Sequence, residues 1–109
     1  MIDIHSHIIP GVDDGSSSEE ESLRMLKTAY ESGVAVIAAT PHYDPASGFP
    51  RCSFDELNER LLALRRAAER ERIPIEIARG MEIFASEELP ELLEEGRVWT
   101  LAHTRYFLV

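Results

Sequence analysis

Two histidines, His5 and His7, stand one residue apart near the start of the chain, and Ile2, Asp3 and Ile4 precede them. This alternation is typical of a β-strand and places Asp3, His5 and His7 on one face. Two imidazoles at this spacing can bind one divalent ion of the Zn, Mn or Fe kind, with carboxylates from elsewhere completing its coordination. Asp3, farther back on the face, could orient a ligand. A surface strand that happens to carry two histidines is the alternative.

The loop after this strand favours the metal interpretation. Pro10 and Gly11 form a turn signal that ends the strand. Asp13, Asp14 and Gly15 follow after Val12, so the loop brings two carboxylates to the end of the strand that carries the histidines. Carboxylates and imidazoles together are a common ligand set for transition metals.

Two further candidates end later strands. His42 stands just past an apolar run over Val34–Thr40, and Glu82 ends a third strand that opens at Ile73. The carboxyl ends of parallel strands meet at one rim, and sites gather there. The predicted metal ligands are therefore His5, His7, Asp14, His42 and Glu82.

The elements between these positions alternate between strand and helix. Ser18 with Glu21, and Ser53 with Glu56, are capping boxes that predict two helix starts. The first helix should stop at Gly33, and the second should be long, with one apolar face. A short third helix around Leu89 to Glu95 and a fourth strand over Tyr106–Val109 complete the pattern. It predicts an α/β fold with a parallel sheet built from βαβ units.

Composition narrows the class of protein. The 109 residues have the length of one domain, and 44% of them are hydrophobic. The single cysteine, Cys52, excludes a disulfide framework, and no apolar run reaches the about 20 residues of a membrane span. We therefore expect a cytoplasmic protein without membrane insertion. The net charge of −9 argues against nucleic-acid binding, although runs such as Glu19–Glu21 are typical of solvated helix faces.

The chain stops inside the apolar run Phe107–Val109, and four strands make only about half of a closed barrel. We therefore expect residues 1–109 to be the amino-terminal part of a single larger domain.

Four segments carry a family resemblance: IDIHSHIIPGVDDG near the start, ATPHY over Ala39–Tyr43, GMEI over Gly80–Ile83 and LAHTRYFLV at the end. In order and spacing they resemble the polymerase-and-histidinol-phosphatase (PHP) superfamily. Within it they are most similar to the bacterial manganese-dependent tyrosine-protein phosphatases of capsule and exopolysaccharide gene clusters.

The resemblance implies a distorted, TIM-like β/α barrel with a trinuclear metal centre. Carried over by position, His5 and His7 would hold one metal, Glu82 would bridge two, and Asp14 and His42 would bind the third. Manganese is the implied metal, although iron, cobalt and zinc accept the same ligands. The family's remaining ligands and phosphate-binding arginines follow the fourth strand, so we expect this piece alone to be inactive.

The implied function is hydrolysis of phosphotyrosine on the tail of a bacterial tyrosine kinase that regulates polysaccharide export. Metal-assisted hydrolysis needs no nucleophilic side chain, and Cys52 lacks the arginine six residues later that a cysteine-based phosphatase requires; Asn58 stands there. Two alternatives stay open. One is a small-molecule phosphoesterase, such as a histidinol-phosphate phosphatase, and the other is a non-catalytic PHP module that stabilises a partner.

Overall fold

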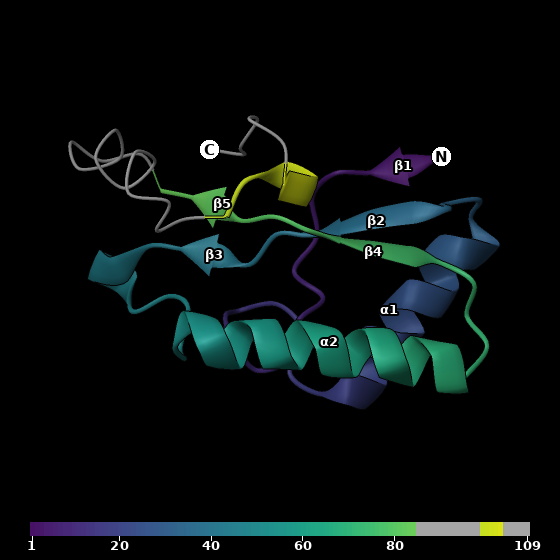
Figure 1. Ribbon diagram of the computed structural model, residues 1–109, viewed down its shortest axis with the longest axis horizontal. Coiled ribbons are helices and arrows are strands. Elements are labelled where there is room, and N and C mark those ends of the chain that lie inside the picture. Colours follow the sequence, from purple (N-terminus) through teal and green to yellow (C-terminus); the bar gives the residue numbers. More distant parts are fainter. Residues whose placement is uncertain (85–98, 104–109) are drawn as a thin grey trace.

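The computed structural model describes residues 1–84 and 99–103 as an α/β arrangement of short parallel strands and two helices (Figure 1). The predicted helix around Leu89 to Glu95 and the predicted strand over Tyr106–Val109 lie outside the described residues. The elements in chain order are β1 (Ile2–Asp3), α1 (Glu19–Glu31), β2 (Val36–Ala39), β3 (His42–Tyr43), the 3-10 helix η1 (Pro45–Ser47), α2 (Phe54–Arg70), β4 (Glu76–Arg79), β5 (Glu82–Ile83) and the 3-10 helix η2 (Leu101–His103).

The strands form two parallel ladders. The first has the order β1-β2-β4, with Ile37 paired to Asp3 on one side and to Ile77 on the other. The second pairs β3 with β5, so that His42 stands opposite Glu82. Both helices lie on the same side of the strands in Figure 1. The predicted α/β class with parallel strands is confirmed.

Pro41 separates the two ladders. Gly80 N donates to Ala39 O at 2.9 Å, and Glu82 N donates to Pro41 O at 2.9 Å, so the pairing continues across the junction. Because Pro41 has no N–H to donate to the neighbouring strand, the regular ladder is interrupted there. The third strand, predicted as continuous from Ile73 to Glu82, is therefore two short strands, β4 and β5. His42 lies just past β2, as predicted, and is also the first residue of the short strand β3.

The first strand is also shorter than predicted, because β1 ends at Asp3. Beyond it, side-chain hydrogen bonds replace the ladder. Ser6 N donates to Thr40 Oγ1 at 2.9 Å, Thr40 N donates to Ser6 O at 2.7 Å, and Ser6 Oγ donates to Ala38 O at 2.6 Å. The buried Thr40 thus holds the segment that carries His5 and His7 against the end of β2.

Both predicted capping boxes begin helices. Ser18 Oγ accepts the N–H of Glu21 at 3.1 Å, and Ser53 Oγ accepts the N–H of Glu56 at 3.2 Å. The apolar face of α2 packs into the core, where Leu57, Leu61, Leu64 and Ala68 are buried and Phe54 is partly buried. Neither helix of the described part is long and apolar enough to span a bilayer.

Candidate metal centre

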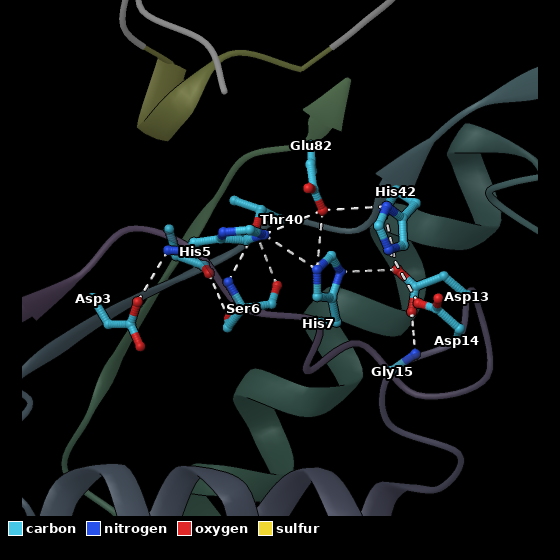
Figure 2. A network of polar contacts seen from close by, with 11 residues as sticks. Asp3, His5, Ser6, His7, Asp13, Asp14, Gly15, Thr40, His42 and Glu82 are labelled. Carbon is cyan, nitrogen blue, oxygen red and sulfur yellow. Dashed lines mark hydrogen bonds and ion pairs between the residues drawn. The ribbon is translucent and has the colours of Figure 1, made fainter. Parts of the chain in front are cut away.

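Three candidate ligand atoms form a triangle just beyond the carboxyl ends of β1 and β4 (Figure 2). Glu82 Oε2 lies 3.1 Å from His5 Nε2 and 3.1 Å from His7 Nε2. The two Nε2 atoms are 3.2 Å apart. Glu82 Oε2 is buried, yet none of these approaches has the geometry of a hydrogen bond to it. A buried carboxylate oxygen surrounded by imidazole nitrogens is expected where a cation completes the arrangement.

The edges of this triangle fit a common metal ion. Ligands at about 2.0–2.2 Å from one ion lie about 2.8–3.6 Å apart in octahedral or tetrahedral geometry. All three edges fall inside that range. Imidazole and carboxylate are the donor set that such ions accept. The residues present therefore fit a transition-metal site.

His42 extends the cluster toward the loop of the two aspartates. Its Nδ1 lies 3.2 Å from Glu82 Oε2, and its Nε2 lies 3.1 Å from Asp14 Oδ1. A neutral imidazole has one N–H and one lone pair, so it can donate to only one of these two oxygens. The other contact places a lone pair beside a carboxylate, which again suits a cation between them. Asp14 is 64% exposed, so this end of the cluster is open to solvent.

Asp13 is buried and contacts two of the candidate ligand residues, His7 and His42. Its Oδ2 lies 3.3 Å from His7 Nδ1 and accepts the backbone N–H of His42 at 2.9 Å. Its Oδ1 accepts the N–H of Gly15 at 2.9 Å. A carboxylate at Nδ1 fixes the tautomer in which Nε2 presents its lone pair to the triangle. Asp13 thus connects His7, in the segment after β1, with His42, the first residue of β3.

Gly15 allows the aspartate loop to pack directly on His7. A Cβ at this position would lie 2.3 Å from His7 Cβ and 2.4 Å from His7 O. Ser16 N donates to His7 O at 2.9 Å, and this hydrogen bond holds the loop against His7. The buried hydroxyls of Ser16 and Ser22 then lie 2.6 Å apart and join this loop to α1.

The structure brings all five residues predicted as ligands into one connected cluster: His5, His7, Asp14, His42 and Glu82. Asp3 faces the backbone instead, since its Oδ1 accepts the N–H of His5 at 3.0 Å. Asp13 was missed as a positioning residue. One of its carboxylate oxygens lies within 4.8 Å of ring nitrogens of His7 and His42. The signal was present in the Asp-Asp pair, but no periodicity in a loop tells which of two neighbouring carboxylates points inward.

Two other polar side chains, those of Cys52 and Tyr43, are not part of this cluster. Cys52 packs partly buried against the core, and burial raises the pKa of its thiol, as expected of a bystander rather than a nucleophile. Tyr43 packs on the core with its ring centroid 5.8 Å from that of Phe54. His103 is the fourth histidine of the chain, and its side chain lies outside the described residues.

Comparison with known proteins agrees with this geometry. The tyrosine-protein phosphatase YwqE of Bacillus subtilis is 34% identical over the whole chain, and the tyrosine-protein phosphatase CpsB of Streptococcus pneumoniae is 38% identical over the whole chain. The chain covers 42% and 44% of these two relatives, so it spans less than half of their length.

A solved structure matches 99% of the chain with a TM-score of 0.84 and 31% identity, and 43% of that structure is covered. It comes from work on YwqE and CpsB as metal-dependent tyrosine phosphatases. The family model described as capsular polysaccharide synthesis, CpsB/CapC, matches residues 1–109. The chain therefore belongs to the CpsB/CapC family.

Proposed function

We propose that this protein is a metal-dependent protein-tyrosine phosphatase of capsule or exopolysaccharide synthesis. Its substrate is phosphotyrosine on the tail of a bacterial tyrosine kinase in the cytoplasm. Residues 1–109 supply the amino-terminal part of a single PHP domain, whose β/α barrel is begun by the strands β1, β2 and β4. The observation that carries the proposal is the position of Glu82 Oε2 within 3.2 Å of ring nitrogens of three histidines.

The residues fit a cluster of divalent ions, for which we propose manganese. His5 and His7 would hold one ion, Glu82 would bridge two, and Asp14 with His42 would hold the third. When bound, such ions neutralise charge on phosphoryl oxygens and activate a water molecule for attack on phosphorus. The acidic residues of the cluster then lie beside cations, which offsets part of the net charge of −9.

The chain's own residues fix the geometry of this chemistry before substrate arrives. Asp13 contacts Nδ1 of the His7 ring and accepts the backbone N–H of His42. Thr40 holds the backbone between His5 and His7 through Ser6. Ligands fixed in this way need little rearrangement when metal or substrate binds.

The relatives favour this function over the two alternatives. YwqE and CpsB are tyrosine-protein phosphatases, whereas a small-molecule phosphoesterase would be expected to match relatives with other substrates. A non-catalytic module has no need for ligand atoms that converge on one point, and here the three atoms of the triangle lie 3.1–3.2 Å apart.

The proposal is tested by phosphate release from a phosphotyrosine peptide with and without Mn²⁺. The assay uses the 109-residue chain and the protein from its complete reading frame. We expect turnover by the complete protein that is lost in His5→Ala and in Glu82→Ala. Glu76→Ala, which removes an exposed carboxylate of β4, is the matched control and should keep activity. Metal binding by the complete protein without turnover of the peptide would contradict the proposal.

A further inference from the structure

The aromatic ring of Phe49 lies against the metal-binding cluster. Its centroid is 5.7 Å from that of His42, and the two rings are inclined by 28°. The backbone fixes this position, because Asp44 N donates to Phe49 O at 2.9 Å and Phe49 N donates to Asp44 O at 3.0 Å. Arg51 N donates to Val12 O at 2.8 Å and ties the same loop to the aspartate loop. Phe49 is thus held beside His42 by elements on both sides.

The surroundings of Phe49 are apolar and open. A groove of about 440 Å³ runs along the loop, and its walls include the rings of Tyr43, Phe49 and Phe54. Phe49 is only partly buried. The exposed side chain of Arg51 lies over the same ring, with Cζ 5.2 Å from the centroid. Beside the proposed metal centre, the structure therefore presents an aromatic surface with a cation next to it.

We infer that Phe49 forms a subsite for the aromatic ring of the substrate, and that Arg51 adds positive charge there. This inference rests on the proposed function. In an aryl phosphate a single ester oxygen separates phosphorus from the ring. A phosphoryl group at the cluster of His5, His7, His42 and Glu82 therefore keeps the ring close to the cluster, and Phe49, with its centroid 5.7 Å from that of His42, is an aromatic surface within reach of it.

The chemistry of this subsite selects phosphate monoesters of phenols over those of aliphatic alcohols. An aliphatic ester carries no ring to pack on Phe49, and it gains only the contacts of its phosphoryl group with the cluster. The Arg51 guanidinium attracts any phosphate dianion, so it strengthens binding without distinguishing the two classes. Phe49 is the specificity-determining residue, and Arg51 affects both ligands alike.

The test measures binding rather than turnover. Calorimetry gives the affinities of the Mn²⁺-loaded protein from the complete reading frame for phenylphosphonate and methylphosphonate, two stable ligands of like charge. We expect tighter binding of phenylphosphonate. Phe49→Ala should weaken phenylphosphonate binding about two- to tenfold and leave methylphosphonate binding unchanged. Phe49→Leu, which keeps apolar volume in the loop, should show the same selective loss if the ring is what matters.

Two substitutions on α1 are the matched controls. Tyr30→Ala removes an exposed aromatic ring, and Arg24→Gln removes an exposed cation. We expect Arg51→Gln to weaken both phosphonates equally, and both α1 variants to bind like the original protein. Equal affinity of the original protein for the two ligands, no binding of either, or an equal loss for both in Phe49→Leu would overturn the inference.

The outcome separates this inference from the proposed function. Turnover of the phosphotyrosine peptide without a preference for phenylphosphonate would overturn the role of Phe49 and leave the phosphatase activity established. A preference that depends on Phe49, without turnover, would support the subsite and overturn the proposed activity.

Discussion

The buried carboxylate of Asp13 contacts one ring nitrogen of His7, with Oδ2 3.3 Å from Nδ1. The other ring nitrogen, Nε2, lies 3.1 Å from Glu82 Oε2. The two carboxylates therefore act on opposite nitrogens of one imidazole. Because Nδ1–H donates to Asp13, the lone pair of Nε2 points at the proposed metal position. Asp13, which is not a predicted ligand, thus orients the ring of His7, which is a predicted ligand.

Asp13→Asn should weaken metal binding about 10- to 100-fold. The Asp13 carboxylate faces three N–H groups, those of His7 Nδ1, His42 and Gly15. An asparagine has one acceptor oxygen, so its amide nitrogen must face one of these donors. We also expect a loss of about 1–3 kcal/mol in the free energy of unfolding without metal. Calorimetric titration with Mn²⁺ and urea unfolding measure the two effects.

Asp14→Asn is the matched control for that variant. Asp14 is exposed, and its ion-pair contact is with His42 Nε2. Its replacement should change the stability of the metal-free protein by less than about 0.5 kcal/mol. An equal loss of stability in the two variants would show that burial of Asp13 does not distinguish them.

Gly15→Ala should destabilise the protein through a steric clash with His7. The added Cβ would lie 2.3 Å from His7 Cβ and 2.4 Å from His7 O, and one of these is backbone, which cannot move alone. We expect a loss of about 1–3 kcal/mol, measured as a lower urea midpoint. Gly80→Ala, whose nearest contacts are side-chain atoms of Leu101 and Thr40, should lose less. The reverse order would contradict the steric explanation.

The helix starts and the cluster could be predicted because they depend on local or repeated rules. A capping box is a hydrogen bond between residues three apart, and Ser18 and Ser53 make it as expected. The convergence of His42 and Glu82 follows from parallel pairing, since β3 and β5 place these two residues opposite each other. Neither inference needs knowledge of long-range side-chain packing.

The remaining features depend on contacts that leave no pattern in the sequence. The early end of β1 results from the Ser6–Thr40 hydrogen bonds, and the break between β4 and β5 lies opposite Pro41. The inward orientation of Asp13 depends on three N–H groups that meet only in the folded loop. The contact of Phe49 with His42 likewise joins a loop to a strand end.

Ser17→Ala should raise the pKa of Glu21. Hydrogen bonds from the hydroxyl and backbone N–H of Ser17, at 2.6 and 3.3 Å, hold the pKa of this carboxyl below its ordinary value. A lowered pKa in the folded state adds stability above the ordinary carboxyl pKa, and this stability is lost as the pH falls through the folded value. The variant should lose part of this acid dependence. An NMR titration of the Glu21 side-chain carboxyl carbon measures the shift, and an unchanged pKa would contradict it.

Glu82→Gln should separate metal binding from the stability of the metal-free fold. Glu82 Oε2 is buried without a hydrogen bond of proper geometry, and an amide nitrogen there could donate to an imidazole lone pair. We therefore expect metal-free stability to be unchanged or increased. The original protein should gain about 2.7 kcal/mol at a Mn²⁺ concentration 100 times its dissociation constant, and the variant should gain almost nothing. Glu76→Gln, an exposed change on β4, should keep the full gain. Thermal unfolding with and without Mn²⁺ measures both quantities, and an undiminished gain in Glu82→Gln would exclude this carboxylate as a ligand.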